Sequence, residues 1–185
     1  MARLGLWIAS LGISALNASA ADAQSMTLTS ADLKDGAAIA NEQALRGFGC
    51  NGGNVSPSLS WNGAPAGTKS FAISIDDPDG GGWRHWVVFN IPRDTTSLPK
   101  GAGDVKKKLM PKGAIQSRND FGAYGYGGPC PPAGDKPHHY QITVFAVDVD
   151  KLPDAKNDAA SAALVGSDLR SHTLAKATLT GLYGR

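Results

Sequence analysis

The sequence predicts a single, mostly β domain that ends in C-terminal helices. The 185 residues include 23 glycines and 11 prolines, a composition that favours a loop-rich β protein over a helical bundle. Several segments alternate apolar and polar residues with the period of two that half-buried strands show. Near the end of the chain the apolar residues change to a helical period. The length is enough to bury the core of one domain.

The predicted strands are short and separated by turns. The clearest alternation is at Phe71, Ile73 and Ile75, whose side chains we expect on one buried face. The run after Trp83 is apolar enough for a central strand. The remaining strands are expected near Met26–Leu28, Pro57–Trp61, Gly113–Ser117 and Tyr140–Val149.

Two glycine-rich segments interrupt these strands. Arg46–Asn54 and residues 119–137 show no periodicity, so we expect loops in both places. The second loop is long, and long ordered loops in compact domains are often functional. A tight turn is predicted at Asp77–Gly82, where an aspartate–proline pair precedes a run of glycines.

The C-terminal segment is predicted to be helical. Asp154 or Asp158 can cap a first helix, Gly166 interrupts it, and Ser167 can cap a second helix. In this interpretation one helical face carries Leu174, Ala175, Leu179 and Leu182.

The first residues have the form of an export signal. Arg3 gives a positive start, and residues 4–16 form an apolar run too short to span a bilayer comfortably. Small residues at Ala18–Ala20 and Ala21–Ala23 offer two cleavage sites. A buried N-terminal helix is the other interpretation, but the order of these features favours a signal peptide over residues 1–23. We therefore expect residues 24–185 to form one periplasmic or secreted domain without a stable membrane anchor.

Two cysteines remain in that predicted mature chain. Each of them, Cys50 and Cys130, lies in a glycine-rich loop. In an oxidising compartment an even count suggests one disulfide, which would tie the two loops together. The alternative is two separate thiols.

The charge of the chain is nearly balanced. The formal net charge is +2, which does not suggest a nucleic-acid partner. The run Lys106–Lys108 is the one basic cluster, and a solvated loop explains it better than a lipid or nucleic-acid patch.

Polar residues gather at two junctions between a loop and a strand. At the first, Asp77 and Asp79 precede the glycine turn, and Trp83 and His85 open the next strand. Strand geometry puts Trp83 and His85 on one face. The reversal through the glycines would bring His85 back near the two aspartates.

The second junction follows a proline-rich turn. Pro131 and Pro132 precede a strand on which His138 and Tyr140 share a face. If the two strands are neighbours, both junctions open at the same end of the sheet.

Together these residue types suit a pocket for a phosphate or a carboxylate. Histidine and tyrosine supply donors, tryptophan supplies an apolar wall, and proline turns bring backbone N–H groups close at little ordering cost. Aspartates would repel an anion, unless one fixes an imidazole tautomer or the ligand carries an ammonium or a protonated phosphate oxygen. Each residue alone has an ordinary explanation, such as a satisfied histidine or common turn chemistry.

The joint pattern resembles the phosphatidylethanolamine-binding protein family, over about Met26 to Tyr183. The resemblance rests on the order and spacing of Asp77-Pro-Asp79, Trp83-x-His85, Gly128-x-x-Pro131-Pro132 and His138-x-Tyr140. Three further stretches look like the bacterial, Raf-kinase-inhibitor-like branch of the family: Asn54-Val-Ser-Pro57, Pro65–Phe71 and Asn119-Asp-Phe-Gly122.

The resemblance implies two packed antiparallel sheets with peripheral helices, and a pocket for phosphate, acetate or phospholipid head groups. No cofactor or resident metal is implied. Carried over residue by residue, the pocket would use Asp77, Trp83, His85, Pro132, His138 and Tyr140, with Asp79 and Pro131 as weaker assignments. The short glycine run before Trp83 implies an open rim. Cys130 stands where eukaryotic relatives have a glycine, which fits a bridge to Cys50.

Three other functions compete with anion binding. A hydrolase is disfavoured because the chain has no Gly-x-Ser-x-Gly or His-Glu-x-x-His motif, and the possible acid–base pair of Asp77 and His85 has no obvious nucleophile. A zinc site would have the right ligand chemistry but matches no short metal motif; its candidate ligands are Asp77, Asp79, His85, His138 and His139. The main alternative to anion binding without turnover is an inhibitor or modulator of a protease or kinase, acting through the same pocket and its rim.

Overall fold

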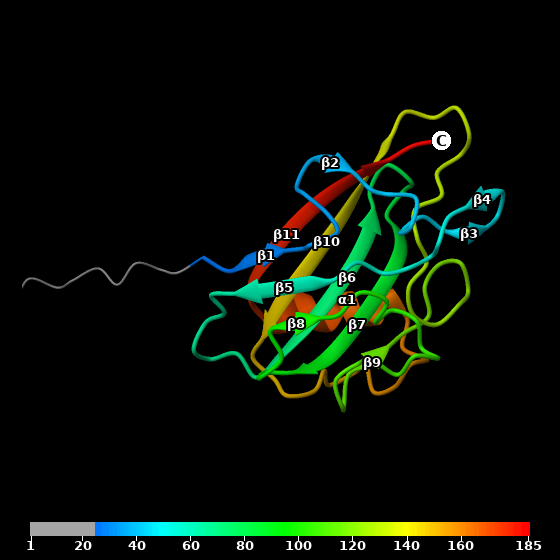
Figure 1. Ribbon diagram of the computed structural model, residues 1–185. Coiled ribbons are helices and arrows are strands. Elements are labelled where there is room, and N and C mark those ends of the chain that lie inside the picture. The colour runs from blue at the N-terminus through cyan, green and yellow to red at the C-terminus, as the bar shows by residue number, and fades with distance from the viewer. Residues whose placement is uncertain (1–24) are drawn as a thin grey trace, which may run out of the picture.

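The computed structural model describes residues 25–185 (Figure 1). The predicted signal peptide, residues 1–23, lies outside the described residues. Within the described residues, no helix has the length and apolar character needed to cross a membrane. The elements are β1 (Thr27–Thr29), β2 (Ala37–Ala38), β3 (Arg46–Gly47), β4 (Cys50–Asn51), β5 (Leu59–Asn62), β6 (Ser70–Asp77), β7 (Trp83–Pro92), β8 (Ser97–Leu98), β9 (Ile115–Gln116), β10 (His138–Val147), α1 (Ala162–His172) and β11 (Thr173–Tyr183).

Two packed sheets form the body of the domain. The larger has the order β2-β11-β10-β6-β7-β9, and all its pairs are antiparallel except the short parallel pair of β2 with β11. The smaller sheet, β1-β5-β8, covers one face of the larger sheet, and α1 covers the other (Figure 1). Strands β3 and β4 form a separate hairpin. The predicted mostly β class is confirmed.

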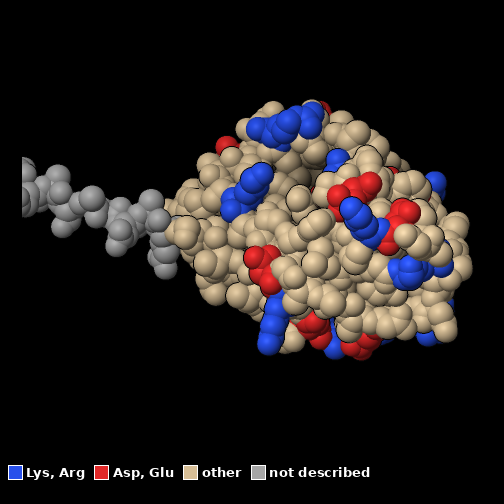
Figure 2. Space-filling model, turned by 90° about the horizontal axis from the view of Figure 1, so that it is seen from above, with Lys and Arg blue, Asp and Glu red and all other residues tan. Residues whose placement is uncertain are grey.

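Charged side chains are scattered over the face of the domain seen in Figure 2, where Lys and Arg are interspersed with Asp and Glu. This agrees with the nearly balanced formal net charge of +2.

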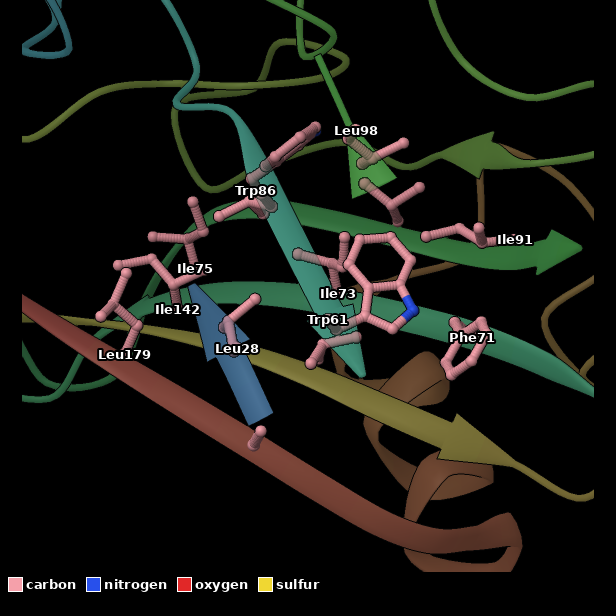
Figure 3. Close-up of a cluster of buried hydrophobic side chains, with 14 of the residues drawn as sticks. Leu28, Trp61, Phe71, Ile73, Ile75, Trp86, Ile91, Leu98, Ile142 and Leu179 are labelled. Atoms are coloured by element: carbon pink, nitrogen blue, oxygen red, sulfur yellow. The ribbon is translucent and has the colours of Figure 1, made fainter. Parts of the chain in front are cut away.

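The main core lies between the two sheets (Figure 3). Alternation along β6 places Phe71, Ile73 and Ile75 on one buried face, as predicted, and this face packs against the smaller sheet. Trp61 from β5 and Trp86 from β7 are almost fully buried in the same core. Full burial of one such side chain stabilises the fold by roughly 1.5–3 kcal/mol. A second, smaller core lies beneath α1, and its larger members are Val87, Phe89, Leu152, Val165 and Leu169.

The prediction of two C-terminal helices was wrong. The structure has one helix there, α1, and its cap is Ser161, whose Oγ accepts a hydrogen bond from the Leu164 N–H at 3.2 Å. Neither Asp154 nor Asp158 is the cap. The segment Thr173–Tyr183, which was expected to be helical, is the strand β11.

The physical reason is that this segment contains two periodicities. Ala175, Ala177 and Leu179 also alternate with a period of two, and they face the core between the sheets. Strand β11 pairs with β10 along its whole length, from His138 opposite Tyr183 to Val147 opposite Thr173. A helix would have left that edge of β10 without backbone partners.

Candidate functional site

Three strands of the larger sheet end or begin at one place. β6 ends at Asp77, while β7 and β10 begin at Trp83 and His138. The two junctions were expected to meet only if β7 and β10 were neighbours. They are not neighbours, because β6 lies between them. Both strands run antiparallel to β6, so both begin at the end where β6 stops, and the junctions do meet.

A β-bulge sets the position of His85. Ile75 pairs with Trp86 and Asp76 pairs with Arg84, so His85 is the extra residue on β7. Bulges next to binding sites commonly re-aim one side chain. Here the bulge lets Trp86 stay in the core while His85, which is 2% exposed, lines a cavity at the strand end.

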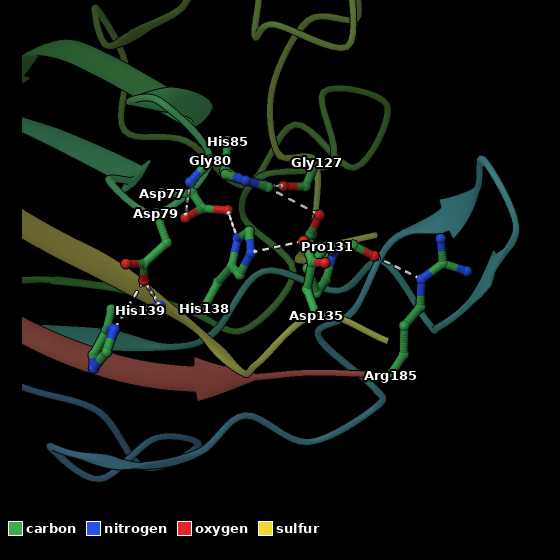
Figure 4. A network of polar contacts seen from close by, with 11 residues as sticks. Asp77, Asp79, Gly80, His85, Gly127, Pro131, Asp135, His138, His139 and Arg185 are labelled. Atoms are coloured by element: carbon green, nitrogen blue, oxygen red, sulfur yellow. Dashed lines mark hydrogen bonds and ion pairs between the residues drawn. The ribbon is translucent and has the colours of Figure 1, made fainter. Parts of the chain in front are cut away.

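The protonation of His85 follows from its partners. Its Nδ1 lies 2.8 Å from the carbonyl oxygen of Gly127 and 3.1 Å from that of Gly128 (Figure 4). Carbonyl oxygens only accept, so Nδ1 carries the proton and donates to them. Burial lowers the pKa of His85, although the carbonyl contacts and the charge of Asp77 oppose this shift. The ring is therefore mainly neutral at neutral pH, and its Nε2 is an acceptor. At this nitrogen the site therefore offers an acceptor, whereas a donor was expected from His85.

His138 has the opposite character. Its Nδ1 donates to Asp77 Oδ2 at 2.7 Å, and both side chains are nearly buried (Figure 4). Burial by itself would lower the pKa of His138, but the hydrogen bond and charge of Asp77, with smaller contributions from other aspartates, raise the pKa above its ordinary value. His138 is the group in this site that most readily becomes a cation.

The Asp77 carboxylate is fully engaged. Its Oδ1 accepts a hydrogen bond from the Gly80 N–H at 2.9 Å, and its Oδ2 accepts from His138. A Cβ at position 80 would lie 2.8 Å from Asp77 Oδ2, so a side chain there would displace the carboxylate from this position. Asp77 therefore orients the imidazole of His138 instead of presenting a free oxygen to the cavity.

A third aspartate stands at the rim. Asp135 Oδ2 lies 3.6 Å from Nε2 of His138, too far for a hydrogen bond. The Nε2–H of His138 is thus still able to donate to a ligand, but an anion bound there would lie close to the Asp135 carboxylate. That competition favours modest affinity.

The cavity has a volume of about 490 Å³, within the usual range of small-molecule sites. Of the predicted site residues, Asp77, Trp83, His85, Pro131, Pro132 and His138 line it. Its other lining residues, which sequence reasoning did not assign to the pocket, are Phe48, Gly80, Asp120, Phe121 and Cys130.

Two predicted residues do not line the cavity. Asp79 turns away and accepts hydrogen bonds from the backbone N–H and Nδ1 of His139, at 2.7 and 2.8 Å. Tyr140 lies behind the two imidazoles, with ring centroids 5.0 Å from His85 and 6.5 Å from His138. Burial raises the pKa of Tyr140, and the charge of Asp77 raises it further, so its hydroxyl stays neutral.

Aromatic side chains form the open wall. Trp83 is 41% exposed and Phe48 is 75% exposed, and both pack on Phe121, at centroid distances of 5.5 and 5.7 Å. The rings of His85 and Phe121 also pack in a T-shaped arrangement, with their centroids 5.3 Å apart. The sequence does contain a signal for this wall, because Phe48 and Phe121 each lie in a glycine-rich loop. A large aromatic residue in such a loop is unfavourable in solvent unless it packs against something.

The disulfide joins the two loops that carry these walls. Cys50 and Cys130 are bonded, with Cα atoms 5.9 Å apart, so the predicted pairing is confirmed. Arg185 adds a second tie, because its Nε donates to the Pro131 carbonyl at 2.7 Å and its Nη1 to the Gly49 carbonyl at 2.9 Å. The proline edge of the cavity is thus held from two sides.

The zinc interpretation gains no support from the geometry. Within residues 25–185, no three His, Cys, Asp or Glu side chains converge in a way that could hold a metal ion.

The family model described as phosphatidylethanolamine-binding protein matches residues 29–184. The chain belongs to this family. Its relatives include the Escherichia coli (strain K12) proteins YbcL, 49% identical over 166 residues (88% of this chain, 90% of YbcL), and YbhB, 44% identical over 161 residues (85% and 99%).

The solved structure of YbcL is described as that of a new member of the mammalian PEBP family. It superimposes with a TM-score of 0.83 and 48% identity, over 86% of this chain and 98% of that one. A less similar relative is LppC of Mycobacterium tuberculosis (strain ATCC 25618 / H37Rv), whose name marks it as a candidate lipoprotein. It is 38% identical over 129 residues, which are 69% of this chain and 58% of LppC.

Proposed function

We propose that this member of the phosphatidylethanolamine-binding protein family binds a small anion reversibly in the cavity at the end of β6. The ligand is a phosphate, a carboxylate or a phospholipid head group. The observation that carries the proposal is the buried pair of His138 and Asp77, which directs a cationic N–H donor into a concave site. Hydrogen bonds to a charged group are worth about 1.5–3 kcal/mol, enough for modest affinity.

The two histidines together favour a singly protonated phosphate. His138 donates through Nε2 to an anionic oxygen, while the neutral His85 accepts through Nε2 from an O–H. A monoprotonated phosphate oxyanion offers both groups. Sulfate has no proton to offer at neutral pH, and a carboxylate satisfies only His138.

The remaining lining suits a head group with an organic part. Phe48, Trp83 and Phe121 provide an apolar wall beside the polar end. The Asp120 carboxylate lines the same cavity and offers a counter-charge for an ammonium, as in an ethanolamine head group.

We propose that the site binds its ligand without turning it over. The lining residues include no serine, threonine or lysine, and the one cysteine among them is held in the disulfide. A covalent mechanism would need an activated nucleophile near His85 or His138.

The proposed location is outside the cytoplasm. A disulfide is stable in an oxidising compartment, and the candidate lipoprotein LppC among the relatives is compatible with such a location. The leader-like first residues support the same proposal.

Calorimetry tests the function. Wild-type protein is titrated with phosphate, acetate, sulfate and phosphoethanolamine, and His138→Ala and His85→Ala are compared with His139→Ala. His139 is the matched control, because it neighbours His138 in sequence but does not line the cavity. We expect the first two variants to weaken phosphate binding roughly tenfold and the control to bind as wild type does.

Three outcomes would count against the proposal. Equal phosphate affinity in all four proteins would place the anion elsewhere. Multiple turnover of a phosphate or carboxylate ester, lost in His138→Ala, would establish an enzyme. Stoichiometric co-purification of a protease or kinase would instead favour the inhibitor role.

A further inference from the structure

A second cavity lies between α1 and the larger sheet, on the face of that sheet that points away from the smaller sheet. It has a volume of about 290 Å³, just below the range of small-molecule sites, which is roughly 300–1,000 Å³. Its apolar floor is formed by Val87 and Phe145 from the strands and by Val165 and Leu169 from the helix. We call this cavity the helix groove.

Three cations line the helix groove from three elements. Arg84 comes from β7, Arg170 from α1 and Lys176 from β11. The single carboxylate of the groove, Asp76, is already paired with Arg84 and also accepts a hydrogen bond from Ser74 Oγ at 2.7 Å. Arg170 and Lys176 form no ion pair with any carboxylate of residues 25–185. The groove thus has an excess of two positive charges next to an apolar floor.

Lys176 places one of the positive charges directly beside the apolar floor of the groove. Lys176 is the cross-strand partner of Phe145, so the ammonium-bearing side chain stands beside the aromatic part of the floor. A ligand with one anionic group and a short apolar tail would satisfy both at once.

Gly166 supports a binding role for the helix groove independently of the charges. It lies in the interior of α1, where glycine destabilises a helix relative to alanine. Apart from the backbone of its own helix, a Cβ at this position would have Arg170 Nη1 as its nearest neighbour, at 3.8 Å, so packing does not demand a glycine. The position lines the helix groove, and its missing side chain keeps the groove open.

We propose that the helix groove binds a small amphipathic anion, a carboxylate with a short apolar tail. The anionic group lies between Arg170 and Lys176, and the tail lies on Phe145 and Val165, in the space that Gly166 leaves free. This site is separate from the cavity at the end of β6, and the two bind independently.

Octanoate is the probe, and acetate and octyl glucoside are its tailless and uncharged counterparts. NMR titration of wild type should shift resonances of α1 and Phe145, with octanoate binding at least about tenfold more tightly than either counterpart. Gly166→Leu should fold at least as stably as wild type, because leucine favours the helix. It should nevertheless bind octanoate roughly tenfold more weakly, because its side chain fills the groove.

Charge variants complete the test. Arg170→Gln and Lys176→Gln should each weaken octanoate binding roughly tenfold, as expected when a hydrogen bond to a charged group is lost. Lys34→Gln, an exposed lysine outside the groove, is the matched control and should bind as wild type does. All of these variants should keep wild-type phosphate binding. The proposal is overturned if octanoate binds Gly166→Leu and wild type equally, if it does not bind wild type, or if His138→Ala loses octanoate binding instead.

Discussion

Replacing Asp77 with asparagine gives the sharpest test of how the β6-end cavity works. If Asp77 only repels an anion, the neutral residue should tighten binding. The structure supports the opposite result, because both carboxylate oxygens are engaged, one by the Gly80 N–H and the other by His138 Nδ1. We therefore expect Asp77→Asn to weaken phosphate binding.

The magnitude follows from the state of His138. Asparagine can still accept from the Gly80 N–H, but it then turns its NH₂ group toward His138 and no longer stabilises an imidazolium. The pKa of His138 should fall, because the hydrogen bond and charge of Asp77 are the main influences that raise it. A neutral His138 still donates through Nε2, but a neutral hydrogen bond is worth about 1 kcal/mol less than a charge-assisted one. The expected loss is therefore five- to tenfold, on the order of 1 kcal/mol.

The matched control is Asp135→Asn. Asp135 lies near the other nitrogen of the same imidazole, where it competes with an incoming anion. This variant should bind phosphate as tightly as wild type or a few-fold more tightly. Calorimetry at pH 7 measures both affinities, and an NMR titration of the His138 ring reports whether its pKa has fallen in Asp77→Asn. Tighter phosphate binding in Asp77→Asn would refute the assigned role of Asp77.

Three further predictions can be checked directly. Acetate keeps its charge above about pH 6, so its affinity for the protein should be highest near that pH. The affinity should decline as pH rises through the folded pKa of His138, which lies above the ordinary 6.5. Calorimetry across this range would show a flat profile if His138 is not the donor. The double variant Cys50→Ser and Cys130→Ser should lower the free energy of unfolding by about 4 kcal/mol, because the disulfide joins residues 80 apart in sequence. A denaturant midpoint equal to that of wild type would contradict this prediction. Exported protein should begin between Ala21 and Ser25 on N-terminal sequencing, and a mature cytoplasmic chain starting at Met1 would count against the signal peptide.

The folded state should also respond to pH through His138. Its raised pKa means that the native state holds this proton more tightly than the unfolded chain does. The resulting stabilisation is fully present below the unfolded pKa of about 6.5 and is lost as pH rises through the folded pKa. Asp77→Asn should remove most of this dependence in urea unfolding measured from pH 6 to pH 9, and an identical pH profile in both proteins would contradict the linkage.

Much of the site could be predicted because its residue types lie close to chain reversals. The order Asp77, Trp83, His85, followed later by His138, sets four side chains at strand ends, and six of the eight predicted residues line the cavity. The positions of the residues at chain reversals could not show that Asp77 lines the cavity and that Asp79 does not. Both belong to one turn, and only the fold places His139 beside Asp79 and His138 beside Asp77.

Local pattern was sufficient wherever the competing interpretation was weak. The alternation of Phe71, Ile73 and Ile75 has no helical counterpart, so strand β6 and its buried face follow from the sequence. An even pair of cysteines in a chain with a leader-like start was likewise enough to predict the disulfide.

The tertiary structure decided what depends on distant partners. The tail carries a helical and a strand period together, and the unpaired edge of β10 selects the strand. The tautomer of His85 is set by carbonyl groups more than forty residues away, at Gly127 and Gly128. Periodicity records only which face of a segment is apolar, whereas pairing, burial and protonation arise from atoms that folding brings together from far along the chain.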